Sequence, residues 1–356
     1  MTRTRAYVAA VFALLAGAGG LPARADVADA LSDLKAGRFL EAAAELQSVV
    51  DRSPGYAYGH FLLGHCKLKT KDVAGAEYEF RRALNLDASR ADYYLGFGLA
   101  LNAGGKWPFT IRAATDGLAR TSDPRTRSAL LALRAYAWGA LRRWSEAVDD
   151  LETLQRIRPQ PWALVFLGKA RFANGDYEGA VAPLRQTLLT LPDDPVVLRL
   201  LAECFIRLAA DETDAARKRF NYTQALAYAH LFASGSPGDL SAFQLVGRAA
   251  LGAGKLEQAE SVFRHVLSID QHQCYAMANL GRTYMAEARW AEAETYLRKA
   301  TVCAPRLATV YESLGDVYLA LGKPEEAAAE FRRASQSEPM RVPSDLPDTV
   351  PVFAPQ

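Results

Sequence analysis

Apolar and small residues recur along most of this chain at the spacing of an amphipathic helix. In residues 311–339 a first stripe begins at Tyr311 and a Leu-Gly pair at 321–322 ends it. A second stripe then runs from Ala327 to Ala334. The pattern predicts two antiparallel helices joined by a short turn.

The helix pair is repeated nine times. One small residue marks the same point in each unit, with spacings of 34, 34, 37, 33, 34, 45, 34 and 34 residues. These residues are Ala30, Gly64, Gly98, Ala135, Gly168, Ala202, Gly247, Gly281 and Gly315. Neither helix of a unit can bury its apolar stripe alone, so neighbouring pairs must stack into one continuous core.

Two irregularities interrupt the period. Three extra residues lie near Ser122-Asp123-Pro124, and an insertion of 11 residues lengthens the sixth unit around 209–221. The insertion is acidic at 211–214 and basic at 217–219. We expect a solvated extension of the hairpin, because polar segments inside repeats usually form exposed turns. The alternative is an insertion that contacts a partner.

This arrangement resembles the tetratricopeptide repeat family over residues 23–339, through its 34-residue period and its Gly/Ala, Ala and Pro positions. The resemblance implies an all-α, right-handed α-solenoid of about nine helix-turn-helix units within residues 26–339. The units would begin near residues 23, 57, 91, 128, 161, 195, 240, 274 and 308. The first helix of each unit would line an inner, concave face.

The first 25 residues have the features of a secretory signal peptide. Arg3 and Arg5 precede an apolar run from Ala6 to Ala18, and small residues flank a cleavage point after Ala25. The run is too short to span a bilayer, which disfavours an uncleaved anchor. We therefore expect a periplasmic or secreted product in an oxidising compartment.

Composition excludes several classes of protein. The chain is 50% hydrophobic and 23% charged, which disfavours a disordered polyelectrolyte, and its 4 Cys are too few for a disulfide scaffold. Removing Arg3, Arg5 and Arg24 with the leader changes the formal net charge from +2 to −1. Neither nucleic-acid binding nor attraction to anionic lipid is expected from that charge.

The residues after the last unit form a Pro-rich tail, 340–356. Pro343, Pro347, Pro351 and Pro355 forbid a regular capping helix there. Because Val and Phe residues lie between the prolines, we expect part of the tail to lie extended along the last helix and replace the cap. Disorder is the alternative.

We find no catalytic or cofactor-binding pattern. The histidines, His60, His65, His230, His265 and His272, show no metal-ligand pair on one helix, and no nucleophile elbow, phosphate loop or Cys-x-x-Cys is present. Asp193-Asp194 is interpreted as a helix cap after Pro192. The sequence therefore predicts a non-enzymatic protein without a cofactor or a metal.

The resemblance places partner-binding residues on the inner face. Those of the first half are largely apolar: Tyr58, Phe61, His65, Leu99, Tyr136, Trp162 and Phe172. Those of the second half are polar with a basic stripe: Lys169, Arg199, Gln244, Arg248, Tyr275, Asn279 and Arg282. A peptide could place apolar side chains in the first half and carboxylates against the second, although a pair such as Arg199 with Glu203 could neutralise the stripe.

Three classes of function remain open. The leading one is a non-catalytic adaptor or scaffold that binds partner proteins of an envelope assembly, secretion or polysaccharide-export system, as the resemblance implies. The second is a glycan-binding solenoid in which Tyr58, Tyr136, Trp162 and Tyr275 stack on sugar rings. An enzyme is third, because the geometry of an active site is missing. The partner and the oligomeric state are not specified.

The four cysteines divide into two pairs. Cys66 and Cys204 occupy the small buried position of first helices four repeats apart, so we expect both thiols to be free. Cys274 begins a first helix and Cys303 lies near the end of the second helix of the same unit. Antiparallel pairing brings these ends to one level, where a disulfide is possible if the two β-carbons face each other.

Overall fold

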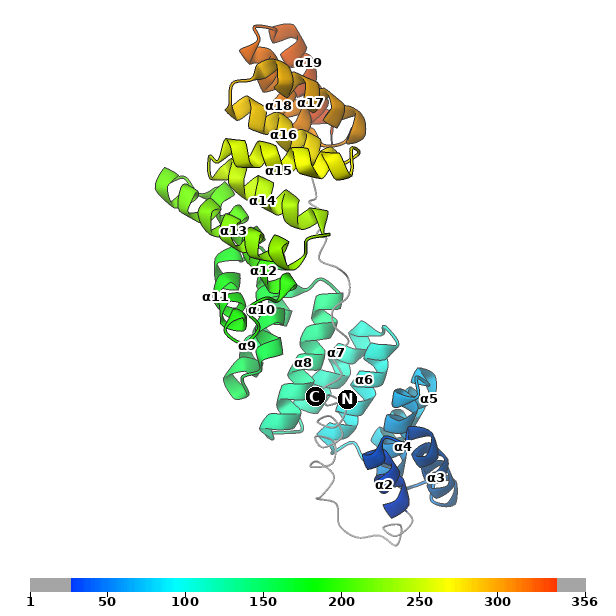
Figure 1. Ribbon diagram of the computed structural model, residues 1–356. Coiled ribbons are helices and arrows are strands. Elements are labelled where there is room, and N and C mark those ends of the chain that lie inside the picture. Colours follow the sequence, from blue (N-terminus) through cyan, green and yellow to red (C-terminus); the bar gives the residue numbers. More distant parts are fainter. Residues whose placement is uncertain (1–26, 338–356) are drawn as a thin grey trace. The chain divides into compact units, whose positions relative to one another are not determined.

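The computed structural model describes residues 27–337 and contains eighteen helices and no strand within them (Figure 1). The helices form nine consecutive pairs, which confirms the all-α solenoid. The signal peptide (1–25) and the Pro-rich tail (340–356) lie outside the described residues.

The first helices of the pairs are α2 (Ala28–Ala36), α4 (Ala57–Lys69), α6 (Ala91–Ala103), α8 (Pro124–Ala140), α10 (Pro161–Ala173), α12 (Pro195–Asp211), α14 (Leu240–Gly252), α16 (Cys274–Ala286) and α18 (Ala308–Ala320). The second helices are α3 (Phe39–Arg52), α5 (Val73–Leu86), α7 (Trp107–Leu118), α9 (Trp144–Ile157), α11 (Tyr177–Leu188), α13 (Ala215–Gly235), α15 (Leu256–Ile269), α17 (Trp290–Cys303) and α19 (Pro324–Gln336).

Most predicted unit starts coincide with the first residue of a helix. Two differ: the first predicted start, near 23, lies outside the described residues, with α2 beginning at Ala28, and α8 begins at Pro124 and not near 128. Here the Asp123 carboxylate accepts a hydrogen bond from the Thr126 amide (2.7 Å), and Pro124 fits the first turn because its missing N–H needs no partner there. The three extra residues thus lengthen a helix. As expected, Asp194 caps α12 in the same way, accepting from the Val197 amide at 3.0 Å.

The turn between the two helices of a unit has a constant geometry. Seven residues after the marker position the backbone is left-handed in every unit except the sixth, where the insertion lies. Glycine fills this position in five units, but Lys71, Arg142 and Ala288 adopt it with φ of 68°, 58° and 55°. Residues with a Cβ are strained in this conformation, so these three turns store unfavourable energy.

The marker glycines make room for a large side chain of the second helix. A Cβ added to Gly64 would lie 3.0 Å from the Phe80 ring, and one added to Gly247 would lie 2.6 Å from Phe263. Both rings are fully buried, 16 residues after the glycine. The small residue of the repeat is therefore the site where the second helix inserts its main core side chain.

Two compact units divide the described chain, residues 27–170 (unit 1) and 171–337 (unit 2), with the boundary inside α10. Within unit 1, α4 contacts α6 and α6 contacts α8; within unit 2, α12, α14, α16 and α18 contact one another in succession. We call the surface formed by these first helices the inner face of each unit. None of the helices within 27–337 is long and apolar enough to cross a membrane.

Helix α11 contains a proline in its interior. Pro183 has no N–H to donate to the carbonyl of Gly179, four residues earlier. Arg171 supplies the missing donor, since its Nη1 lies 2.6 Å from the Gly179 oxygen. A side chain from the preceding helix thus completes the hydrogen bonding of α11.

The last helix, α19, has a polar outer surface. Glu325, Glu326, Arg332 and Gln336 are exposed, whereas Ala327 and Ala334 are buried against the array. A polar terminal helix is what a stacked array needs at its end. The helix provides a solvated end within the described residues, whatever the tail adds.

Candidate functional site

The inner face of unit 1 is built around stacked aromatic rings. Phe61 is only 3% exposed and packs against Tyr58, His65, Phe80 and Tyr93, with ring centroids 4.7–6.1 Å apart. Phe61 therefore offers almost no surface to a partner in this structure, and its role as a binding contact stays a prediction. Its ring belongs to the core, because aromatic residues of both helices and of the next repeat cover it.

His65 and Tyr58 lie beside this core. The His65 ring meets Phe61 and Phe80 edge-on, and burial lowers the pKa of His65 to about 4, so the side chain is neutral at pH 7. Tyr58 is half-buried; its hydroxyl has no hydrogen-bond partner within the described part of the chain, and burial raises its pKa. The Arg90 guanidinium lies 5.9 Å from the Tyr58 ring. This end of the face offers little exposed aromatic surface.

The remaining predicted residues of unit 1 are half-buried. Leu99 packs against the core of α6, α7 and α8, and Trp162 packs against the core of α8 and α9. Tyr136 meets Trp107 edge-on at 5.8 Å, and burial raises its pKa. Lys169 is half-buried as well. The apolar surface of Leu99, Tyr136 and Trp162 is therefore largely used in packing.

The inner face of unit 2 is polar and more accessible. The Arg248 Nη1 donates to Glu203 Oε1 at 3.1 Å, joining α14 to α12, and the two side chains are 34% and 24% exposed. Tyr275 is 43% exposed, and Asn279 and Arg199 are half-buried. The predicted basic stripe is thus interrupted by Glu203, which pairs with Arg248 of the neighbouring first helix.

Arg282 is a half-buried cation of this face. Its Nε donates to Ser313 Oγ (3.1 Å) and its Nη2 to the Thr309 carbonyl (3.2 Å), both on α18. Burial and nearby Arg248 lower the pKa of Arg282, and Glu312 opposes that shift. Arg282 therefore joins two repeats. Phe172, at the other end of unit 2, contacts Tyr177 edge-on and is half-buried.

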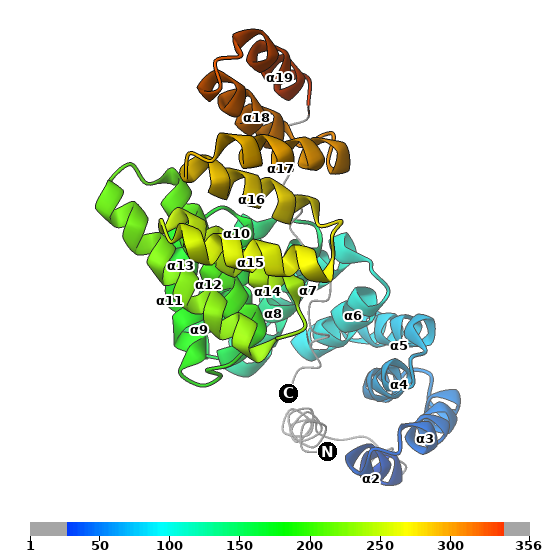
Figure 2. The same cartoon turned by 45° about the horizontal axis from the view of Figure 1, so that its top comes forward.

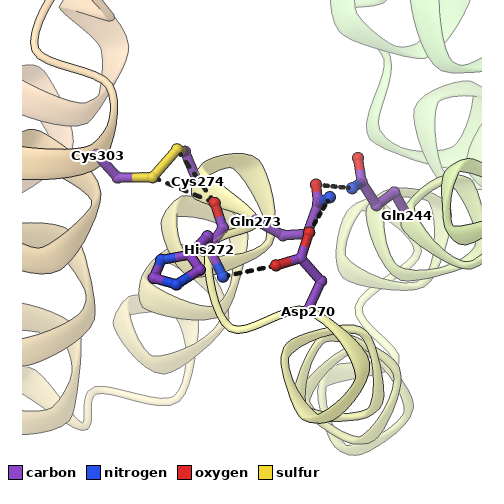
Figure 3. Close-up of a disulfide and its surroundings, with 6 residues drawn as sticks. All are labelled: Gln244, Asp270, His272, Gln273, Cys274 and Cys303. Atoms are coloured by element: carbon purple, nitrogen blue, oxygen red, sulfur yellow. Dashed lines mark hydrogen bonds between the residues drawn. A yellow bond between two sulfur atoms is a disulfide. The ribbon is translucent and has the colours of Figure 1, made fainter.

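The turn before α16 connects this face to a disulfide (Figure 3). Cys274 and Cys303 are bonded, with α-carbons 5.5 Å apart, and both sulfurs lie within 3.4 Å of the His272 carbonyl oxygen. Asp270 accepts hydrogen bonds from the His272 amide (2.9 Å) and from Gln273 Nε2 (2.8 Å).

Gln273 extends this network to the preceding repeat. Its Oε1 accepts a hydrogen bond from Gln244 Nε2 at 3.0 Å. The disulfide and the Asp270 turn therefore hold the first turn of α16, and through it a predicted inner-face residue of α14. The sequence analysis predicted the disulfide as a possibility but not this network, because nothing in the sequence near Gln244 or Gln273 indicates that the two side chains pair.

The other two cysteines are buried and free, as expected, and burial raises the pKa of each thiol to about 12. Such thiols are unreactive near neutral pH. No group of three or more His, Cys, Asp or Glu side chains within residues 27–337 is arranged to hold a metal ion.

One buried cluster of ionisable groups was not anticipated. His60 Nδ1 lies 2.7 Å from Glu79 Oε2, its Nε2 lies 3.1 Å from the Pro54 carbonyl, and Lys67 pairs with the other Glu79 oxygen at 2.7 Å. Each ring nitrogen thus faces an acceptor oxygen. His60 is 6% exposed, so the cluster ties α4 to α5 and offers no reacting group to a substrate.

These features define a helical-repeat scaffold with two ordered inner faces. Sequence profiles described as tetratricopeptide repeat match residues 27–93, 250–311 and 308–339. The chain is a tetratricopeptide repeat protein. A search of curated proteins finds no match.

Solved structures match parts of this chain. The C-terminal part of a TPR repeat-containing protein from Cytophaga hutchinsonii is 15% identical, with a TM-score of 0.56, and covers 71% of this chain and 99% of its own. A thermophilic TPR protein of Thermus thermophilus is 20% identical, with a TM-score of 0.41, over 54% and 99%. MamA is 18% identical, with a TM-score of 0.39, over 48% and 93%.

Proposed function

We propose that this chain is a non-catalytic adaptor that binds partner proteins on its inner faces, in an envelope assembly, secretion or polysaccharide-export system reached after export from the cytoplasm. The signal-peptide features of residues 1–25 support the location. The tetratricopeptide fold supports protein–protein interaction as the general role.

One observation carries the proposal: the ordered, partly exposed polar groups on the inner face of unit 2. The Arg248–Glu203 pair spans two repeats at 34% and 24% exposure. A pair that solvent reaches contributes only about 0.2–1 kcal/mol to stability. Stability alone therefore gives little reason to place such a pair on this face, whereas a partner with complementary polar groups would use it.

The experiment reverses this pair. Arg248→Glu places two carboxylates together, and Glu203→Arg with Arg248→Glu restores an ion pair of opposite orientation. Partners are cross-linked in the native envelope fraction and counted after capture of the parent, both variants and Arg306→Glu, an exposed control. We expect the double variant to regain thermal stability but not its partners, and the control to behave as the parent. Full recovery of partners by the double variant would refute recognition at this face.

The glycan alternative is less well supported. Sugar stacking needs exposed ring faces, and among the four proposed aromatic residues only Tyr275 is exposed; Tyr58, Tyr136 and Trp162 are half-buried. Retention on purified peptidoglycan or exopolysaccharide, lost on Tyr275→Ala, would favour this alternative over the adaptor.

A further inference from the structure

The hairpin of α12 and α13 projects beyond its neighbours in unit 2, at the connection between the two helices (Figures 1 and 2). Helix α13 has 21 residues, whereas the other second helices have 12–14. The insertion thus forms additional helical turns, and only residues 212–214 lie between the two helices. The expectation of an exposed extension holds, but its form is helix and not loop.

The start of α13 carries a cluster that we call the basic tip: Arg217, Lys218, Arg219 and Phe220. All four side chains are exposed, and Phe220 is 58% exposed. None of the three cations forms an ion pair with another residue of the range 27–337. Their charges therefore face solvent.

The acidic residues beside the basic tip accept hydrogen bonds from backbone amides. Asp214 Oδ1 accepts a hydrogen bond from the Arg217 amide at 2.7 Å and caps α13. Glu212 Oε1 accepts from the Asp214 amide at 3.0 Å. These contacts hold the two carboxylates in the turn and not against the cations.

The charge of the basic tip is also unfavourable for the helix that carries it. The positive end of the helix dipole lies at the N-terminus, where cations are unfavourable and carboxylates are favourable. Arg217 is the third residue of α13, and Lys218 and Arg219 follow it. Three consecutive cations here work against helix stability, so their placement is better explained by a ligand than by folding.

The extension is held rigidly at its base. Arg185 of α11 donates to Tyr228 Oη (3.0 Å) and Gln224 Oε1 (3.1 Å). Tyr222 packs on the backbone of α14, since a Cβ added to Gly252 would lie 2.3 Å from its ring. A rigid surface loses little conformational entropy when a partner binds.

We propose that the basic tip is a second docking surface, separate from the inner faces, for an acidic segment of a partner protein that carries an apolar side chain. Carboxylates would pair with the three cations, and the apolar side chain would cover Phe220. A protein segment fits better than a membrane or a nucleic acid, because the patch is small and the chain without its leader carries a formal charge of −1.

The test measures binding of a labelled synthetic peptide of alternating Glu and Asp with a central Leu-Phe, at two salt concentrations. Its counterpart has Gln and Asn in place of the acids. The variant is Arg217→Glu/Lys218→Glu/Arg219→Glu, which places carboxylates at the favourable end of α13 and should keep it folded. Arg112→Glu/Arg306→Glu/Arg332→Glu makes the same change in net charge at exposed positions elsewhere.

We expect the parent to bind the acidic peptide at least about tenfold more tightly than its amide counterpart, with the difference shrinking at high salt. The tip variant should lose that preference, the control triple should keep it, and Phe220→Ala should weaken binding about threefold. Equal binding of the two peptides, or equal loss in both triple variants, would overturn the proposal. So would tighter binding of the parent to vesicles containing phosphatidylglycerol, or to single-stranded RNA, than to the peptide.

Discussion

The contact between Arg171 and Gly179 can be tested by removing either the donor or the need for it. Arg171→Met deletes the guanidinium that donates to the Gly179 carbonyl at 2.6 Å. A hydrogen bond from a charged donor contributes about 1.5–3 kcal/mol. Because Arg171 is partly exposed, we expect the free energy of unfolding to fall by about 1–2 kcal/mol.

The second background is Pro183→Ala, which restores an amide four residues after Gly179. The new N–H can bond to the Gly179 carbonyl within the helix, so the guanidinium is no longer required. In this background Arg171→Met should cost about 0.5 kcal/mol or less, which gives a coupling of about 1 kcal/mol between the two positions.

The assay is urea unfolding followed by far-ultraviolet circular dichroism for all four proteins, with equal m-values as the condition for comparison. Arg171→Lys is the control, because it keeps the charge near Asp176, 3.8 Å from the guanidinium, without the planar donor. Equal costs of Arg171→Met in both backgrounds would refute the coupling between Arg171 and the proline.

Three further predictions concern stability. Reduction of the Cys274–Cys303 bond, or Cys274→Ser with Cys303→Ser, should lower the free energy of unfolding by about 3–4 kcal/mol, and the serine variant should show no response to dithiothreitol. Burial lowers the pKa of His65 to about 4 from 6.5, so stability should be lost as pH falls from about 6.5 toward 4. Between pH 7 and 4 the parent should lose about 2 kcal/mol more than His65→Gln, and equal losses would exclude His65 as the cause. Ala288→Gly should raise the free energy of unfolding by about 0.5–1 kcal/mol, whereas Ala291→Gly inside α17 should lower it; destabilisation by both would refute strain at Ala288.

The period of the sequence was sufficient to predict the helices, because each unit must bury the same apolar stripes against its neighbours. The marker residues predicted where helices approach, and Gly247 against Phe263 shows why a small residue is required there. The fourth unit begins four residues earlier than predicted, at Pro124. The spacing of the repeat is the same whether extra residues lengthen a helix or a loop, so the sequence could not distinguish the two.

The candidate site was less predictable, because it depends on contacts between repeats. The family resemblance predicted Phe61 as an inner-face residue, whereas the structure shows its ring packed against Tyr93 of the next repeat. Arg248 and Glu203 are 45 residues apart, so sequence spacing could suggest only the local pair with Arg199. The sequence predicted that Cys274 and Cys303 lie at one level of their hairpin. Only the structure shows that the two side chains face each other and are bonded.

The disulfide also changes how this array can come apart. A stack of repeats opens most easily from its free end, one helix at a time, because each unit contacts only its neighbours. The bond joins the first residue of α16 to the last residue of α17, so α17 cannot peel away from its exposed end. Fraying that begins at α19 must therefore stop at this hairpin or open it as one piece. For the same reason, a protease that cuts once between residues 275 and 302 leaves both fragments covalently joined.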